Sequence, residues 1–291
     1  MSPEIDTLNP PEPIRFDGYM PQSEEIGELY DHLGPFYATI WDGDIHVGIW
    51  YGEEDDASMT EAQERLTRLL IERTEIGPGE RLLDVGCGTG KPALQLAEET
   101  GCDVLGVTIS PWQVDAANQA ARDAGLADRV RFELADAMSL PYDEASFDAA
   151  WAFECLQHMP DFRHVLGQIG RVVRPGGSFI LTDCVNEKPL TEEEKAIFFP
   201  ALGVSSLTGK AHYPTWLRRA GFETLDMLEL GDEIERTILM IQQGIEAKAE
   251  ALREHYDDEF FAQMGGAWGR LSEIHRAKMS YLLISARRLD G

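Results

Sequence analysis

The sequence predicts an α/β fold, with a doubly wound, mostly parallel sheet and helical lid insertions near both ends of the chain. From residue 81 onward, short and almost continuously apolar segments alternate with helical patterns, which is typical of parallel strands covered on both faces. The first apolar segment leads into DVGCGTGKP, residues 84–92, a glycine-rich turn between a strand and a helix. Turns of this kind let the backbone approach phosphates or nucleosides closely.

The elements can be assigned in order along the chain. Ser58 is a candidate N-cap for a helix over 58–74, whose leucines share one face. Apolar runs predict strands at 81–86, 103–109, 130–135, 147–153, 178–185, 223–230 and 279–289. Helical patterns lie between the first five strands, at 91–100, 111–124, 138–140 and 161–173. Residues 232–276 predict charged, amphipathic helices.

The chain is expected to divide into four segments. They are an N-terminal arm and lid over 1–57, a ligand-binding core over 58–185, a helical cap over 186–278 that gives the core one strand near 223–230, and a final core strand over 279–291. The proline-rich, polar residues 1–25 predict an irregular arm, and residues 24–52 are rich in aromatic side chains.

Composition excludes several classes of protein. The formal net charge of −27 at pH 7 argues against nucleic-acid binding, which needs a basic surface. No run of 18 apolar residues occurs and the N-terminus has no signal-peptide pattern, so no membrane span and a cytoplasmic location are expected. The four cysteines lack the spacing of zinc or disulfide motifs and are expected to be buried free thiols. Formation of a homo-oligomer stays open.

Two common glycine-rich motifs fit the turn poorly. A P-loop needs Ser or Thr after Gly-Lys, but Pro92 follows Lys91 and Val85 takes the place of the first glycine. A dinucleotide fingerprint needs a third glycine where Lys91 stands. The second strand also ends at Thr108, where NAD-binding proteins usually have an acidic residue for the ribose. An NAD-dependent oxidoreductase is therefore the weaker alternative.

A third interpretation fits the turn and three later segments. Asp84, Gly86, Gly88 and Gly90 have the spacing Asp-x-Gly-x-Gly-x-Gly after a strand. The segments LADAMSLPY (134–142), FDAAWAFECLQHMPD (147–161) and VVRPGGSFILTD (172–183) follow in order. Together they resemble the motifs of class I S-adenosylmethionine-dependent methyltransferases, which have a Rossmann-like fold. The two ends of the chain resemble bacterial small-molecule, natural-product methyltransferases.

The resemblance implies S-adenosylmethionine as cofactor, S-adenosylhomocysteine as product and a small-molecule acceptor. In such a site the glycines approach the methionine and ribose, and Asp84 orients the turn or, through water, the ammonium group. The further expected cofactor residues are Tyr30, Trp50, Thr108, Ser110, Gln113, Asp136, Ala137, Met138 and Phe153. Since Thr108 replaces the usual acid, Ser110 and Gln113 are expected to bind the ribose hydroxyls. Asp136 is expected at the adenine, although a helix N-cap is its alternative role.

The acceptor is expected to meet residues from the lid and the cap. The candidates are His46, Tyr51, His212, Tyr213 and Trp216. By resemblance the aromatic N-terminal segment closes over the cofactor, where ring faces attract a positively charged sulfonium. Hydrophobic anchoring of the arm is the alternative role for Trp50 and Tyr51.

Three polar residues after the fourth and fifth strands are candidate catalytic groups. His158 is expected to be the general base for a hydroxyl acceptor, because a neutral hydroxyl must lose its proton, and Asp183 would orient it. Glu154 would be the base if the enzyme instead methylates a terpenoid alkene through a carbocation that aromatic rings stabilise. The sequence favours oxygen as the acceptor atom, then carbon, then nitrogen, and it leaves the choice of base open.

Two further alternatives concern metals and activity. A metal-dependent catechol mechanism would need an Asp-Asn pair near a strand end, but Cys184 follows Asp183, so no metal is expected. A diphosphate-bearing acceptor would need basic anchors, for which Lys210, Arg218 and Arg219 are the candidates. A catalytically silent module that binds S-adenosylmethionine is the alternative from another class of protein.

Overall fold

The computed structural model describes residues 12–41 and 44–290, without the side chains of 238, 242 and 262–267. Two parts of the expected arm and lid over 1–57, residues 1–11 and 42–43, therefore lie outside the described residues. Within the described chain, seven strands form one sheet in the order β3-β2-β1-β4-β5-β7-β6. Their bounds are β1 (Arg81–Val85), β2 (Asp103–Thr108), β3 (Val130–Leu134), β4 (Phe147–Phe153), β5 (Val173–Asn186), β6 (Phe222–Glu229) and β7 (Met279–Arg288).

The sheet confirms the predicted fold class. Strands β3, β2, β1, β4 and β5 are mutually parallel, whereas β7 runs antiparallel to both β5 and β6. All seven predicted strands are present, and only β5 begins several residues early. Residues 174–177 of β5, which include Pro175, Gly176 and Gly177, bulge out of the register between Phe147↔Val173 and Ala149↔Ser178.

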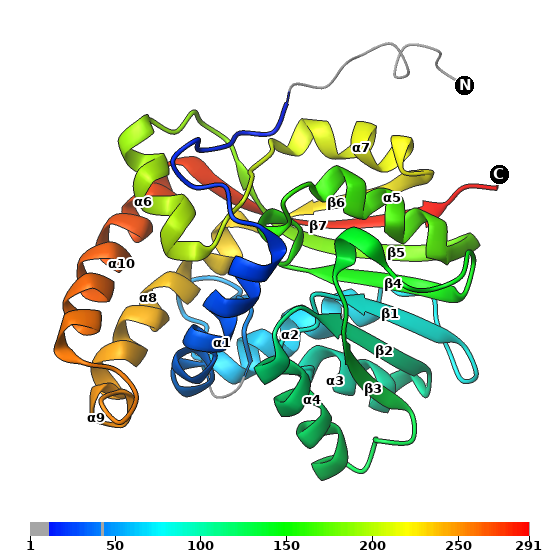
Figure 1. Ribbon diagram of the computed structural model, residues 1–291, viewed down its shortest axis with the longest axis horizontal. Coiled ribbons are helices and arrows are strands. Elements are labelled where there is room, and N and C mark those ends of the chain that lie inside the picture. Colours follow the sequence, from blue (N-terminus) through cyan, green and yellow to red (C-terminus); the bar gives the residue numbers. More distant parts are fainter. Residues whose placement is uncertain (1–11, 42–43, 291) are drawn as a thin grey trace.

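Helices cover both faces of the sheet (Figure 1). One face packs on α2 (Met59–Ile71), α3 (Lys91–Thr100) and α4 (Pro111–Asp123), and the other on α5 (Phe162–Val172) and α7 (Tyr213–Arg219). Ser58 caps α2 as predicted, since its side chain accepts the N–H of Glu61. Three short 3-10 turns complete the core: η2 (Ala137–Ser139), η3 (Leu156–His158) and η4 (Lys210–His212).

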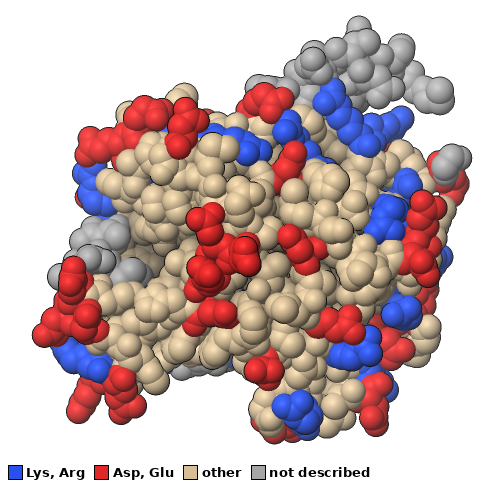
Figure 2. Space-filling model, viewed as in Figure 1, with Lys and Arg blue, Asp and Glu red and all other residues tan. Residues whose placement is uncertain are grey.

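A third group of helices packs beyond the sheet. It consists of α1 (Ser23–Ile40), α6 (Glu192–Leu202), α8 (Gly231–Ala247), α9 (Ala249–Leu252) and α10 (Asp258–Lys278). Their apolar side chains form a hydrophobic cluster distinct from the two clusters on the sheet. In Figure 1, α1 lies in front of the strand ends, between the parallel strands and the group of α6, α8 and α10. Figure 2 shows acidic side chains in several separate clusters on one face of the molecule, in keeping with the strongly negative net charge.

Helix α1 docks closely on the turn between β2 and α4. An added Cβ at Gly27 would lie 2.8 Å from the carbonyl oxygen of Ile109, and one at Gly34 would overlap the ring of Trp112. Between these glycines, Asp31 accepts hydrogen bonds from the Ser110 hydroxyl (2.5 Å) and the Trp112 backbone N–H (3.2 Å). Small residues and one carboxylate thus fix α1 against the first turn of α4.

Gly34→Ala is expected to lower the free energy of unfolding by about 1–3 kcal/mol, because the methyl group overpacks the contact with Trp112. Gly167→Ala is the matched control, since that helical glycine is exposed and an added Cβ meets nothing within 4 Å. There the same change should stabilise the protein by roughly 0.5–1 kcal/mol. Urea unfolding of both variants measures the difference, and equal effects would contradict close docking of α1.

Candidate active site

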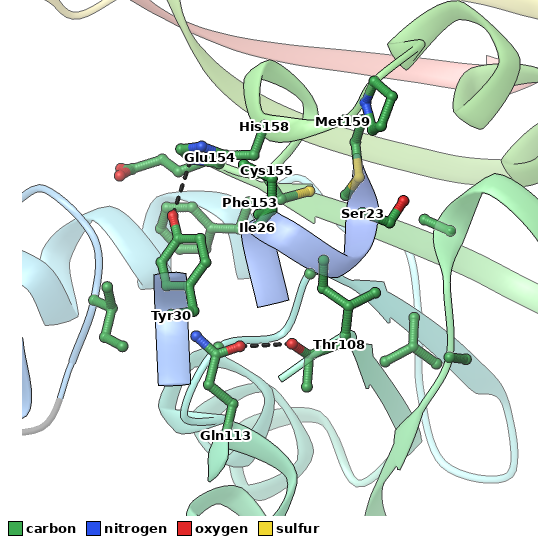
Figure 3. A pocket seen from close by; sticks show the side chains of 18 residues that line it. Ser23, Ile26, Tyr30, Thr108, Gln113, Phe153, Glu154, Cys155, His158 and Met159 are labelled. Carbon is green, nitrogen blue, oxygen red and sulfur yellow. Dashed lines mark hydrogen bonds between the residues drawn. The ribbon is translucent and has the colours of Figure 1, made fainter. Parts of the chain in front are cut away.

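A first cavity lies where β1, β2 and β4 end and α1 crosses them. It encloses about 690 Å³ of empty space, counted out to where it opens to solvent. Its lining includes Tyr30, Gly86, Gly88, Thr108, Gln113, Ala137, Phe153, Glu154 and His158. Figure 3 shows Tyr30 rising from α1 toward His158, with the Gln113–Thr108 pair on the opposite wall. Nine expected site residues therefore meet in one place.

The glycine turn forms one end of this cavity. Gly86, Gly88 and Gly90 have φ values of +71°, +53° and +82°, a conformation that favours glycine. A Cβ at Gly86 would overlap that of Cys155, whereas Gly88 borders open space. Gly90 instead begins α3, where it leaves room for the ring of Phe132. The turn is thus a backbone cradle in which only the first two glycines face the cavity.

Asp84 lies in a smaller hollow beside this turn, together with Gly86, Gly88 and Phe153. The side chain is buried, and no described residue hydrogen-bonds its Oδ1 atom. Burial raises the pKa of Asp84 to about 7. A buried carboxylate with an unsatisfied oxygen needs a polar or cationic partner, so this hollow can hold such a group.

Gln113 and Thr108 form a polar wall between the cradle and α1. The Thr108 hydroxyl donates to Gln113 Oε1 (2.6 Å) and accepts the N–H of Ser110 (3.2 Å). Gln113 Oε1 is thereby engaged, which leaves its amide N–H groups to face the cavity (Figure 3). Ser110 does not line the cavity; it caps α4 and binds Asp31, so its role here is to hold Gln113 in place.

The expected adenine residues divide between two roles. Ala137 lines the first cavity. The carboxylate of Asp136 accepts the N–H of Met138 at 2.8 Å and caps η2, which is the alternative that the sequence analysis gave. Met138 packs on the hydrophobic cluster beneath α5.

A second cavity adjoins the first on the side of α6, α8 and α10. It holds about 930 Å³ of empty space and is lined mainly by apolar and aromatic side chains. These include Tyr37, Trp41, Phe198, Leu202, Ile241, Trp268 and Leu271. Four residues line both cavities: Tyr30, Ile45, Glu154 and His158. Two of the three candidate catalytic residues, Glu154 and His158, therefore lie at the boundary between the two cavities.

His158 is held from two sides at this boundary. Its Nδ1 atom lies 3.0 Å from the carbonyl oxygen of Gly203, which can only accept a hydrogen bond, so Nδ1 carries the proton. In the neutral ring the lone pair is then on Nε2, 3.1 Å from the Tyr30 hydroxyl. The Ser205 hydroxyl also donates to the backbone oxygen of His158 at 2.7 Å. Burial lowers the pKa of His158 below 6.5, which keeps the ring neutral.

Glu154 follows β4 with a left-handed backbone, at φ +52°. Its Oε1 atom accepts hydrogen bonds from the Tyr281 hydroxyl (2.6 Å) and from the N–H of Val47 (3.0 Å). Burial raises the pKa of this carboxyl. Glu154 thus ties the segment after α1 to the centre of the sheet, while it still faces both cavities.

Three expected lid residues have other positions. Trp50 is buried in the helical cluster, with its indole N–H donating to the Ala57 carbonyl, and Tyr51 is 64% exposed. Neither lines the two cavities. Trp50 fits the alternative of hydrophobic anchoring, whereas Tyr51 is too exposed to anchor the arm and contacts Arg65 at the surface. His46 is buried against the ring of Phe153, 4.3 Å between centroids, and pairs with Asp44 at 3.2 Å. It borders the hollow of Asp84 rather than the second cavity.

The acceptor residues that were expected in the cap do not reach the second cavity, and neither does Asp183. They lie on the opposite face of the sheet. Odd-numbered residues of β5 point toward α5 and α7, where the carboxylate of Asp183 accepts the Tyr213 hydroxyl. Trp216 packs there on Phe162, and His212 precedes the same helix. Strand side chains alternate between faces, so Asp183 and Cys184 diverge and only Cys184 reaches the second cavity. The partner that orients His158 is Gly203 instead of Asp183.

Three residues that position the site were not predicted from the sequence. Asp31, Gly203 and Ser205 act through backbone or capping contacts, for which the sequence carries no local pattern. Among the described residues, no three His, Cys, Asp or Glu side chains gather as metal ligands. No helix within the described ranges is long and apolar enough to span a membrane.

Comparisons with known proteins agree with this architecture. Residues 76–221 match a family described as a methyltransferase domain. (+)-O-methylkolavelool synthase of Herpetosiphon aurantiacus is 38% identical over 268 residues, covering 92% of this chain and 95% of that protein. 27-O-demethylrifamycin SV methyltransferase of Amycolatopsis mediterranei is 35% identical, covering 93% and 99% of the two chains.

A solved structure, described as the [4+2]-cyclase SpnF, has a TM-score of 0.83 and 33% identity, covering 93% of this chain and 98% of that one. The two relatives and this structure each match more than nine tenths of the chain, whereas the family match spans residues 76–221. The chain therefore belongs to the class I S-adenosylmethionine-dependent methyltransferases, in the group that acts on small molecules.

Proposed function

We propose that the protein methylates a hydroxyl oxygen of a neutral, largely apolar natural product, with His158 as the general base. The observation that carries the proposal is the position of His158, whose lone pair on Nε2 lies where the two cavities meet. A neutral imidazole can take the proton that a hydroxyl must lose as it attacks. Relatives named for O-methylation of kolavelool and of 27-O-demethylrifamycin SV support oxygen as the acceptor atom.

The first cavity fits S-adenosylmethionine, which supplies an electrophilic methyl group on a sulfonium. The unpartnered Oδ1 of Asp84 suits the ammonium group, directly or through water. Gly86 and Gly88 allow close approach of the backbone, and Gln113 with Thr108 suits the ribose hydroxyls. Ala137 and Phe153 offer apolar contact at the remaining walls. Tyr30 closes this cavity from α1.

The second cavity suits an acceptor without a strong negative charge. None of the described residues that line it is Lys or Arg. The basic residues expected for a diphosphate are elsewhere: Lys210 pairs with Glu229 at 2.7 Å and Arg219 stacks on Trp216. A buried anion without a cation would be strongly penalised, so an uncharged terpenoid or polyketide alcohol is the better fit.

C-methylation of an alkene remains the second candidate. It is favoured by Glu154, a buried carboxyl at the boundary, and by the aromatic rings of Trp41, Trp268 and Tyr281 in the second cavity. However, one carboxylate oxygen of Glu154 already accepts two hydrogen bonds. We therefore assign Glu154 a positioning role.

A panel of acceptors tests the proposal. Purified protein with S-adenosylmethionine is incubated with kolavelool, 27-O-demethylrifamycin SV, farnesol or farnesyl diphosphate, and the products are examined by mass spectrometry. Methyl ethers of at least one neutral alcohol, and no product from the diphosphate, are expected. Cofactor binding without transfer to any acceptor would favour the silent binding module, and a C-methylated product would favour the second candidate.

Glu154→Gln separates the two candidates further. A glutamine can keep both hydrogen bonds through its amide oxygen, so alcohol methylation should fall by less than about 10-fold, far less than the 10²–10⁴ expected for loss of a general base. Steady-state kinetics with the best alcohol of the panel measure this ratio. A loss as large as that of a His158 variant would identify Glu154 as a base.

A further inference from the structure

Tyr30 occupies the lone pair that the proposed base needs. Because Nδ1 of His158 is bonded to Gly203, the Tyr30 O–H must donate to Nε2, at 3.1 Å. The two rings are perpendicular, at 89°, with centroids 5.6 Å apart, so the phenol approaches His158 edge-on (Figure 3). The Gln157 side-chain amide lies farther from the same Nε2 atom, at 3.4 Å. Tyr30 is therefore its nearer partner, and an acceptor hydroxyl that bonded Nε2 directly would have to displace it.

The phenol oxygen is itself placed for the acceptor. Tyr30 is one of the four residues that line both cavities. Its oxygen donates one hydrogen bond, to His158, and has lone pairs left to accept another. A hydroxyl in the second cavity can thus donate to Tyr30 while Tyr30 donates to His158.

We infer that Tyr30 is a catalytic residue that relays the acceptor's proton to His158. As the acceptor oxygen forms its bond to the methyl carbon and the methyl–sulfur bond breaks, the acceptor O–H proton moves to the Tyr30 oxygen. In the same step the Tyr30 proton moves to Nε2. The products are a methyl ether, the neutral thioether of the cofactor, neutral Tyr30 and a protonated His158 that later returns its proton to solvent. This inference rests on the proposed function.

The surroundings of Tyr30 hold its side chain in a fixed position, as a proton relay requires. The adjacent Asp31 is bonded to Ser110 and to the Trp112 N–H, which fixes this turn of α1. Tyr37, about two helical turns further along α1, packs on the Tyr30 ring, with 6.4 Å between the ring centroids. Burial holds the pKa of Tyr30 well above 10, so the phenol passes a proton on without remaining ionised.

Tyr30→Phe removes the relay oxygen and keeps the ring. We expect single-turnover methylation of the best alcohol of the panel to slow by about 10- to 100-fold, with cofactor affinity retained. In H₂O/D₂O mixtures, the rate of the wild-type protein should depend on deuterium fraction along a bowed curve, because two protons move. The variant should give a straight line, because one proton moves. The acid limb of its pH profile should move to higher pH, since neutral Nε2 loses a donor.

Tyr256→Phe is the matched control. Its hydroxyl also contacts α1, accepting the N–H of Phe36 (3.1 Å) and donating to the carbonyl of His32 (2.7 Å), but it lines neither cavity. This variant should keep the rate and the bowed curve. An unchanged or faster Tyr30→Phe variant, or a slower one that keeps the bowed curve, would overturn the relay. Full activity of His158→Ala would instead overturn the proposed function, whatever Tyr30 does.

Discussion

Replacement of His158 by alanine is expected to lower kcat for the alcohol acceptor by about 10²–10⁴-fold, the usual contribution of a general base. S-adenosylmethionine affinity should change little, because the polar contacts of His158 go to Tyr30, Gly203, Gln157 and Ser205 rather than to the glycine cradle. Steady-state kinetics and calorimetric titration of the cofactor measure the two quantities separately.

The pH profile gives a second, independent measure of the same residue. A base must be neutral to act, and burial lowers the pKa of His158 below its usual 6.5. Activity of the wild-type protein should therefore rise with pH through an apparent pKa below 6.5 and then stay level. This rise in activity with pH should disappear in His158→Ala. It should persist in His255→Ala, which removes an exposed histidine. Equal rates for the His158 variant and the wild-type protein would exclude this residue as base.

Asp84→Asn is expected to weaken cofactor binding and to stabilise the cofactor-free protein. Loss of the carboxylate should cost about 10- to 100-fold in S-adenosylmethionine affinity, the value of one charge-assisted hydrogen bond. The same substitution should raise the stability of the cofactor-free protein. Because burial raises the pKa of Asp84 from 3.8 to about 7, the folded state releases this proton less readily, so its stability falls as pH rises from about 4 to about 7.

The full penalty above pH 7 is on the order of 4 kcal/mol, since each pKa unit corresponds to about 1.4 kcal/mol. No described residue hydrogen-bonds Oδ1, so the amide recovers only part of this penalty, and a gain of roughly 1–3 kcal/mol is expected at pH 8 and almost none at pH 4. Chemical unfolding at the two pH values measures it. Asp115→Asn, at an exposed site on α4, is the control that should change neither stability nor affinity. A destabilised Asp84→Asn protein would show that the carboxylate has a structural partner.

Local patterns in the sequence were sufficient to predict the strands of the sheet and several residues of the first cavity. Each strand is a short apolar run bounded by turn residues, and the alternation of strands with helices determines which ends gather. Gly86, Gly88, Thr108, Gln113 and Ala137 therefore reach one cavity as predicted. A helical lid near the N-terminus was predicted, but the bounds of α1 were not, because Gly27, Gly34 and Pro35 are unfavourable inside a helix. The helix is held by contacts with the distant turn at 109–112 and by its apolar face in the helical cluster.

The acceptor side could not be predicted in the same way. Which face of the sheet a helix covers depends on tertiary packing, so the aromatic residues of α7 were expected in a cavity that α6, α8 and α10 in fact surround. Neighbouring strand residues point to opposite faces of the sheet. An error of one residue in position therefore decides whether Asp183 or Cys184 is expected to face the second cavity. Gly203 acts through its carbonyl oxygen, a group that every residue carries and that no sequence pattern distinguishes.

That carbonyl has a consequence for engineering the enzyme. Gly203 ends α6 with φ +63°, and Phe198 and Leu202 of the same helix line the second cavity. One continuous stretch, Glu192 to Gly203, thus lines part of the proposed acceptor cavity and fixes the tautomer of His158. Chimeras that exchange α6 between relatives to change acceptors should stay active only if the junction preserves the left-handed turn at Gly203.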